Sequence, residues 1–187
     1  MSQKTRCAWV NPENKLYMKY HDEEWGRPVY DDRVLFEFLV LEWAQAWLSW
    51  ETILKRREWY RQVFFDFSLE KCSELSDEEL ENILQDARII RNRLKIFSVR
   101  KNAQVFWEIQ KEFWSFSNYL WNFVWEKQII NHPKTPSEVP AKTELSDCIS
   151  KDLKKRGMSF VGSTIIYAYL QAVGLVDDHT VDCFCKK

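Results

Sequence analysis

Hydrophobic positions recur at helical spacing along most of the chain. The longest such run lies between Asn92 and Glu112, where apolar side chains follow one another every three or four residues. Its apolar members are Ile96, Val99, Ala103, Phe106 and Ile109. This period places them on one face of a helix. No segment alternates clearly enough between apolar and polar residues to predict a strand, so the expected fold class is all-α.

Capping residues mark where several helices begin. Asp31 or Asp32 precedes one apolar run and Ser49 precedes the next, while Ser76 and Glu79 have the capping-box spacing. In each case a side-chain oxygen can accept a hydrogen bond from a backbone N–H that the first helical turn leaves unpaired. The segments predicted to be helical are 31–48, 50–60, 77–84, 92–112, 117–125, 145–156 and 163–173.

The last third of the chain is predicted to contain a loop followed by a pair of helices. Three prolines between residues 131 and 141 exclude a helix there. The two helices that follow are joined by six residues, from Gly157 to Gly162, in a chain that has only four glycines. Gly157 can end the first helix in the left-handed region, and Gly174 has the matching position after the second.

Length and composition describe one globular domain over residues 1–187. With 45% hydrophobic and 29% charged residues, a disordered chain is excluded. No apolar run approaches the roughly 18 residues of a membrane span, and the polar start of the chain is not a secretory signal. We therefore expect a cytoplasmic protein with no membrane partner. The formal net charge is −1, but residues 88–101 carry only basic charges, which permits a basic face.

The turn between Gly157 and Gly162 has the features of an anion site. Backbone N–H groups at the start of the second helix favour an anion, with help from the helix dipole. Lys155 and Arg156 lie on the preceding turn, and Ser163 adds a hydroxyl donor. A DNA phosphate suits this pattern. The alternative that the residues leave open is a plain corner between two helices with solvated lysines.

Cysteines and histidines near the two ends of the chain form a set suited to zinc. Five cysteines is an odd number, and a chain without a secretory signal favours metal binding over disulfides. The candidate ligands are Cys7, His21, His179 and Cys183. A helical turn would place the last two, four residues apart, on one face. Because four protein ligands leave no open position, this Zn²⁺ would be structural and would clip residues 7–21 to residues 179–183.

Several features of this candidate metal site stay open in the sequence. Cys185 could replace one of the thiolates, and Asp22 or Asp178 could orient the imidazoles. Spacing cannot establish a pairing across the whole chain, so the alternative is two unrelated buried cysteines and two surface histidines.

Glu42 is an acid on an apolar stripe of the predicted helix 31–48. Its neighbours at helical spacing are Phe38, Leu39 and Ala46, so we expect a desolvated carboxyl group with a raised pKa. The aromatic residues near it in sequence or in the N-terminal segment are Trp9, Tyr17, Tyr20, Trp25, Trp43, Trp47 and Trp50. Such a set can stack on a flat cationic heterocycle while the carboxylate accepts from an exocyclic amine. The alternative is an ordinary aromatic core with Glu42 at its rim.

These residues belong to motifs that carry a family resemblance over about residues 6–185. The motifs are Cys7-Ala8-Trp9-Val10, residues 20–26 (YHDEEWG), Leu41-Glu42, Gln45-Ala46, Leu48-Ser49-Trp50, residues 89–96 (IIRNRLKI), residues 154–157 (KKRG), residues 160–162 (FVG) and Asp178-His179. In this combination and order the chain resembles bacterial DNA-3-methyladenine glycosylase I, a family of helix–hairpin–helix enzymes of base-excision repair.

The resemblance implies a two-lobed all-α bundle of the helix–hairpin–helix glycosylase type, monomeric and acting on alkylated double-stranded DNA. It implies a pocket in which Glu42 and Tyr20 hydrogen-bond a flipped 3-methyladenine and Trp50 stacks on it. Trp9 and Trp25 would lie nearby, and the hairpin would hold the phosphate backbone. It also implies a structural zinc held by Cys7, His21, His179 and Cys183. No lysine stands out as a Schiff-base nucleophile, so hydrolysis releasing free 3-methyladenine without strand cleavage is expected.

One position departs from the family pattern. Trp47 stands where the resemblance leads us to expect glycine, and a glycine beside a pocket usually permits close approach. Trp43 is also large for its place. The alternative function is therefore a zinc-containing DNA-binding homologue whose activity is weakened or lost because Trp47 alters the pocket. A zinc hydrolase unrelated to DNA would need an open coordination position, which four protein ligands do not leave.

Overall fold

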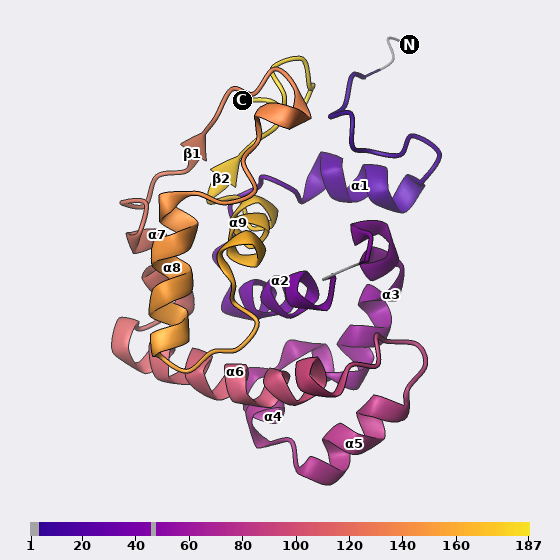
Figure 1. The fold of residues 1–187 in the computed structure, drawn as a ribbon, viewed down its shortest axis with the longest axis vertical. Helices are drawn as coiled ribbons and strands as arrows, with labels where there is room; N and C mark the ends of the chain where they lie inside the picture. The colour runs from indigo at the N-terminus through magenta and orange to yellow at the C-terminus, as the bar shows by residue number, and fades with distance from the viewer. Residues whose placement is uncertain (1–3, 46–47) are drawn as a thin grey trace.

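The computed structural model describes residues 4–45 and 48–187, and Figure 1 labels its elements. The α-helices are α1 (Lys15–Glu23), α2 (Asp32–Gln45), α3 (Trp50–Val63), α4 (Leu69–Glu74), α5 (Asp77–Gln85), α6 (Arg93–Phe113), α7 (Phe116–Asn122), α8 (Glu144–Lys155) and α9 (Ser163–Ala172). Two 3-10 turns, η1 (Phe65–Phe67) and η2 (Pro136–Glu138), and two short strands, β1 (Ile129–Ile130) and β2 (Val176–Asp177), complete them. The chain is mostly helical, as its hydrophobic period predicts.

Helix α2 forms the centre of the molecule. Its residues from Leu35 to Ala44 are all buried, and it packs against α3, α6, α7 and α9. A helix that is apolar on nearly every side is expected to be enclosed in this way. Its buried acid Glu37 is paired with Arg57 and Arg61 of α3, at 2.6 Å and 2.9 Å. Glu42, further along the same helix, has no such partner among the described residues, which distinguishes the two buried acids of this helix.

The predicted caps are present. Asp31 accepts from the backbone N–H of Val34, Ser49 caps α3, and Ser76 forms a full capping box with Glu79. The prediction that the helix beginning at Asp31 or Asp32 reaches Leu48 is wrong. The described part of α2 reaches Gln45, Leu48 lies in a bend outside any helix, and Ser49 has extended backbone angles and caps α3. The predicted residues Ala46 and Trp47 lie outside the described part of the chain.

Helices α8 and α9 form the predicted pair with a six-residue connection. Gly157 has φ +104°, the left-handed conformation expected at the end of α8. Asn102 of α6 holds the turn from both sides, since its amide accepts from the backbone N–H of Ser159 and donates to its carbonyl, each at 2.9 Å. Ser150 Oγ donates to the carbonyl of Val161 at 2.6 Å. The turn is therefore fixed against α6 and α8.

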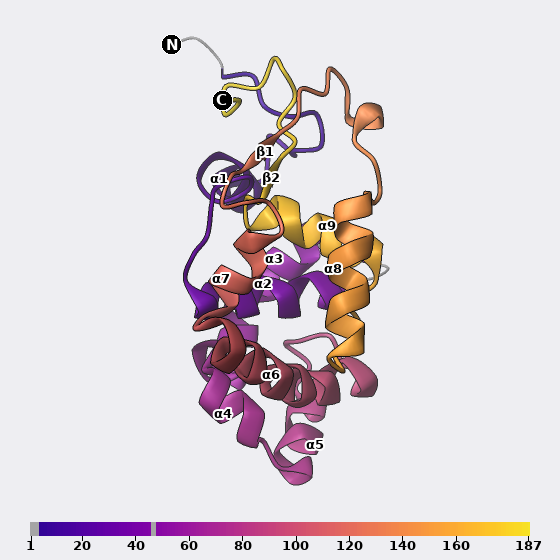
Figure 2. The ribbon, with the colours of Figure 1, turned by 90° about the vertical axis from the view of Figure 1, so that its left-hand side faces the viewer.

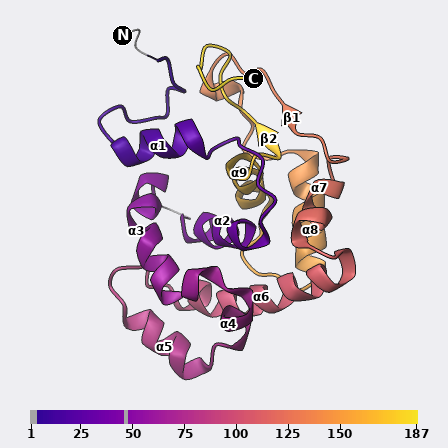
Figure 3. The same ribbon diagram turned by 180° about the vertical axis from the view of Figure 1, so that it is seen from behind.

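The two ends of the chain lie together, at the opposite end of the molecule from α4 and α5 (Figures 2 and 3). Strands β1 and β2 pair in parallel there, which corrects the expectation of a chain without strands. The predicted helical turn from His179 to Cys183 is also wrong. The N–H of Val181 donates to Pro133 O and that of Phe184 to Thr5 O, so these groups pair with distant segments. Among the described residues no helix is long and apolar enough to span a membrane.

Candidate functional site

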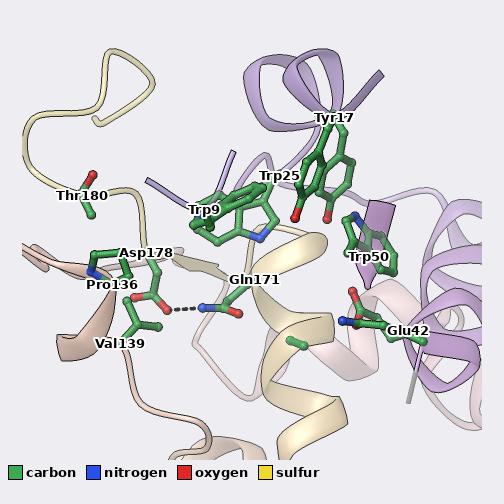
Figure 4. A pocket seen from close by; sticks show the side chains of 13 residues that line it. Trp9, Tyr17, Trp25, Glu42, Trp50, Pro136, Val139, Gln171, Asp178 and Thr180 are labelled. Carbon is green, nitrogen blue, oxygen red and sulfur yellow. Dashed lines mark hydrogen bonds between the residues drawn. The ribbon is translucent and has the colours of Figure 1, made fainter. Parts of the chain in front are cut away.

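A cavity of about 300 Å³ lies between α1, α2, α3 and α9. Its lining residues are Trp9, Tyr17, Tyr20, Trp25, Glu42, Gln45, Trp50, Pro136, Val139, Ala168, Gln171, Asp178 and Thr180 (Figure 4). Five of the seven aromatic residues expected near Glu42 line it, namely Trp9, Tyr17, Tyr20, Trp25 and Trp50, and Trp47 lies outside the described residues. Trp43 is buried in the core and is not among the lining residues.

The aromatic side chains that line the cavity form two groups of contacting rings. Trp9 contacts Tyr17 and Trp25, with ring centroids 5.3 Å and 5.0 Å apart, and Tyr20 lies 5.4 Å from Trp50. The pairs are tilted or edge-on, the arrangements that aromatic rings favour among themselves. Nε1 of Trp50 is buried without a hydrogen-bond partner among the described residues. The two groups enclose a space suited to a flat ring.

Glu42 is the unpaired acid of the cavity. Its side chain is 5% exposed, and no described residue donates a hydrogen bond to it. Burial raises the pKa of Glu42 to about 8. A carboxyl group in that condition is mostly protonated at neutral pH, and a cation entering beside it would stabilise its ionised form. Burial, reinforced by the charge of Glu42, also raises the pKa of Tyr20, so its phenol remains a hydrogen-bond donor.

The opposite side of the cavity is polar, and the sequence analysis did not predict it. Gln171 of α9, Asp178 and Thr180 contribute side chains there, and Pro136 and Val139 from the proline-containing loop cover it. A polar glutamine within the otherwise apolar second half of α9 was the available signal. That signal was not enough to place Gln171 in a cavity, because the loop over residues 131–141 covers this side and no local pattern specifies the position of the loop.

Close to this wall is a buried cluster of metal-ligating side chains. His21, His179, Cys183 and Cys185 each offer a ligand atom, and these four atoms lie within 4.8 Å of one another. Nε2 of His21 is 3.4 Å from the Cys183 sulfur, and Nε2 of His179 is buried with no partner among residues 4–45 and 48–187. Two imidazoles and two thiols at such separations match a tetrahedral zinc site.

The histidines are oriented by aspartates. Asp22 lies 2.8 Å from Nδ1 of His21, as the sequence allowed, but the partner of His179 is Asp177, at 2.7 Å. The alternative partner, Asp178, instead accepts from Tyr167, Gln171 and Asn131. Carboxylates bound to Nδ1 leave Nε2 of both rings for a metal, the arrangement seen around metal-ligating histidines.

Cys7 and Cys185 both lie at the metal-ligating cluster, but only Cys185 is within its compact group of four. Cys7 is buried beside it and accepts a hydrogen bond from Thr180 Oγ1 at 3.7 Å. Burial raises the pKa of the Cys7 thiol to about 12 and that of Cys185 to about 11. A thiol of this kind ionises readily only next to a cation.

The predicted phosphate-binding residues have different surroundings. An added Cβ at Gly162 would meet nothing within 4 Å, so the start of α9 is open. Lys155 is exposed, whereas Arg156 is held by Glu112 and Asp152, at 2.5 Å and 2.7 Å. Ser163 Oγ is 2.8 Å from Ser146 Oγ. Lys155 and Gly162 are thus accessible to a ligand, while Arg156 and the Ser163 hydroxyl already have protein partners.

Comparison with known proteins gives the same family over the whole chain. The methyladenine glycosylase family matches residues 9–186. A DNA-3-methyladenine glycosylase of Haemophilus influenzae is 44% identical over 182 residues, which cover 97% of this chain and 98% of the relative. DNA-3-methyladenine glycosylase 1 of Escherichia coli is 45% identical over 180 residues, 96% of both chains.

Solved structures agree in fold. A crystal structure of 3-methyladenine DNA glycosylase I has a TM-score of 0.94 at 43% identity, covering 98% of this chain and 100% of the other. A tyrosine-to-phenylalanine variant of 3-methyladenine DNA glycosylase I in complex with 3-methyladenine also has a TM-score of 0.94, at 34% identity and 97% coverage of each chain.

A helical fold with a buried acid in an aromatic cavity defines a hydrolase of N-glycosyl bonds when it accompanies such full-length similarity. The chain belongs to the methyladenine glycosylase family.

Proposed function

We propose that this enzyme removes 3-methyladenine from alkylated double-stranded DNA. The damaged base would leave the helical stack and enter the cavity, where Trp50 stacks on it and Glu42 and Tyr20 hydrogen-bond its edge. Trp9, Tyr17 and Trp25 would complete the enclosing wall. The observation that carries this proposal is the buried Glu42 carboxyl group, which has no partner inside a cavity of aromatic rings.

The chemistry required of the protein is modest. Methylation at N3 makes adenine cationic and a good leaving group, so the enzyme must chiefly extract the base, select it and exclude bulk water. Glu42, whose pKa burial raises to about 8, would ionise as the cation enters and would stabilise the charged form. We propose simple hydrolysis, with water taking the place of the base and the DNA strand left intact.

DNA binding is proposed for the helix–hairpin–helix formed by α8, the turn 157–162 and α9. The backbone N–H groups at the start of α9 would hold a phosphate, and Gly162 leaves them accessible. Lys155 would add a cation on the same side. The bundle would then be of the helix–hairpin–helix glycosylase type and two-lobed, with the cavity between the lobes, and would act as a monomer in the cytoplasm, where bacterial DNA is found.

The metal-ligating cluster would hold one structural zinc. His21, His179 and Cys183 would supply three ligands, and either Cys7 or Cys185 the fourth. Bound there, Zn²⁺ would act as a cross-link between the N-terminal segment and the C-terminal turns. Four protein ligands leave no position for an activated water, so the metal would support the cavity wall without entering the reaction.

Release of free base from methylated duplex DNA tests the proposed activity. Wild type should release 3-methyladenine, and the strands should stay intact until alkali is added. Glu42→Ala should lower the rate by about 100-fold, the scale of one lost electrostatic stabiliser in a closed site. Glu58→Ala removes an exposed acid of α3 and is the matched control. Release by Glu42→Ala at the wild-type rate would show that Glu42 does not have this role.

The sequence also motivates a second function. Trp47, outside the described residues, replaces the glycine that the resemblance leads us to expect. If it fills the pocket, the chain would bind duplex DNA without releasing a base. Salt-sensitive DNA binding by wild type with no base release, and restored release in Trp47→Gly, would favour that function over the glycosylase.

A further inference from the structure

The polar wall of the cavity contains a side chain whose orientation is fixed by its neighbours. Gln171 lines the cavity from the last turn of α9, and Figure 4 shows it between Asp178 and Glu42. Its backbone carbonyl accepts from the N–H of Gly26 at 3.0 Å, which ties this turn to the segment after α1. The side chain is therefore presented from a rigid element and not from a loop.

The direction of the Gln171 amide follows from hydrogen-bond chemistry. Its Nε2 donates to Asp178 Oδ2 at 2.7 Å, and a carboxylate can only accept. The NH₂ group must therefore face Asp178, and Oε1 must face away from it. In Figure 4 this oxygen is directed toward the side of the cavity where Glu42 lies. Among the described residues no donor is bound to Oε1.

Asp178 is itself held in place from two other sides. Tyr167 donates its hydroxyl to Oδ2 at 2.6 Å, and Asn131 donates its amide to Oδ1 at 2.7 Å. Three donors bound to the carboxylate hold it in this orientation. Its effect on the cavity is indirect, because it determines which end of Gln171 the ligand meets.

We infer that Gln171 determines specificity for adenine over guanine, with Asp178 as its positioning residue. The inference rests on the proposed function. Adenine bears an exocyclic amine, a donor, where guanine bears O6, an acceptor. The amine has two hydrogens, so Glu42 and Gln171 Oε1 can each accept one. A guanine in the same pose would place O6 against the Gln171 carbonyl and leave both acceptors unpaired in a buried site, which hydrogen-bonding sites reject strongly.

Competition between two methylated purines tests this inference. Duplex DNA carrying both 3-methyladenine and 3-methylguanine is incubated with wild type and Gln171→Met, and both free bases are quantified to give the ratio of their kcat/KM values. Methionine keeps the length of the side chain and removes the acceptor. The kcat/KM for 3-methyladenine divided by that for 3-methylguanine should fall by at least about tenfold, chiefly through slower release of 3-methyladenine. Gln104→Met, on an exposed part of α6, is the matched control and should leave the ratio unchanged.

A second variant reverses the hydrogen bond without altering Gln171 itself. In Asp178→Asn the new amide can donate to Gln171 Oε1, which lets the glutamine turn its NH₂ group into the cavity. The ratio should then fall further than in Gln171→Met, because guanine O6 gains a donor. A purely structural role for Asp178 would slow the release of both bases equally. Metal content is measured in parallel, since Asp178 adjoins His179.

The possible failures are distinguishable. Wild type that releases neither base overturns the proposed function. Wild type that releases 3-methyladenine, while Gln171→Met keeps the wild-type ratio, overturns only the role of Gln171. Binding of free 3-methyladenine, followed by tryptophan fluorescence, supplies a measurement independent of catalysis, and affinity unchanged in Gln171→Met would also count against the inference.

Discussion

Oδ1 of Asp177 lies 2.7 Å from Nδ1 of His179 and also accepts the backbone N–H of the same residue at 3.0 Å. These two contacts fix the imidazole and leave its Nε2 buried with no partner in the described part of the chain. Asp22 holds His21 through Nδ1 in the same way. A buried ring nitrogen of this kind costs free energy unless it has a ligand, which supports the proposal that a metal binds there.

Protein purified without added metal should contain one zinc per chain. Cys183→Ser should lose the metal and lower the melting temperature on the order of 10 °C, because the cross-link between the chain ends contributes directly to folding. Metal analysis and thermal unfolding are the measurements. Cys148→Ser changes an exposed cysteine far from the cluster and should alter neither quantity.

The fourth ligand is identified by comparing two further variants. The compact geometry predicts that Cys185→Ser weakens zinc binding more than Cys7→Ser, because the Cys185 sulfur lies within the group of four and Cys7 outside it. Competition with a chelator measures both affinities. The reverse order would assign the position to Cys7, as the family resemblance implies, and would mean that the N-terminal segment moves closer when metal binds.

Lys155 and Arg156 are adjacent in sequence but should behave differently when replaced. Lys155 is exposed, so Lys155→Ala should weaken duplex binding and reduce the slope of log affinity against log salt by about one, with stability unchanged. Arg156 is paired with Glu112 and Asp152 and lies over the rings of Phe113 and Tyr119. Arg156→Ala should therefore destabilise the fold by about 1 kcal/mol.

Binding titrations at several salt concentrations, together with thermal unfolding, separate these two effects. A loss of DNA affinity in Arg156→Ala as large as that in Lys155→Ala, at unchanged stability, would show that the arginine leaves its carboxylates to meet DNA. That result would restore the role that the sequence pattern assigned to it.

Features of the fold that depend on neighbouring residues were predictable from sequence. The caps at Ser49 and Ser76, the long helix α6 and the left-handed Gly174 all follow from local hydrogen bonding and side-chain period. The acid Glu42 was recognisable in the same way, since a carboxyl group on an apolar helical stripe has no favourable local environment. Trp50 was close to Glu42 in sequence, whereas the aromatic residues of the N-terminal segment were only a candidate set until the family resemblance implied that they line the same pocket.

Features that depend on contacts between distant segments were not predictable. The turns around Cys183 are formed by backbone bonds to Pro133 and Thr5, which no local pattern contains. For the same reason the sequence offered Asp178 as a partner for the histidines, whereas Asp177 has that role and Asp178 orients Gln171. Adjacent residues in an extended segment point to opposite sides. Asp177 therefore faces His179, while Asp178 faces Gln171.

The activity of the enzyme should rise with pH as Glu42 ionises. Since the base in DNA is cationic, the carboxylate form stabilises it and the protonated form does not. With the pKa of Glu42 raised to about 8, log kcat/KM for 3-methyladenine release should increase from pH 6 to 8 and then level off. Glu42→Gln should be slower and should lack this rise. Activity that falls above pH 8 would instead indicate that Glu42 acts as an acid.

The raised pKa of Glu42 should also make the folded protein less stable as pH rises. Because the folded-state pKa of Glu42, about 8, lies above its ordinary value of 4.5, the unfolded chain loses this proton first as pH rises. The wild type should therefore lose stability relative to Glu42→Gln between about pH 4.5 and 8, with a slope approaching 1.4 kcal/mol per pH unit. Denaturant unfolding across this range measures the difference, and Glu58→Gln, at an exposed site, is the control. A constant difference between wild type and Glu42→Gln at all pH values would show that the carboxyl group is solvated and not buried.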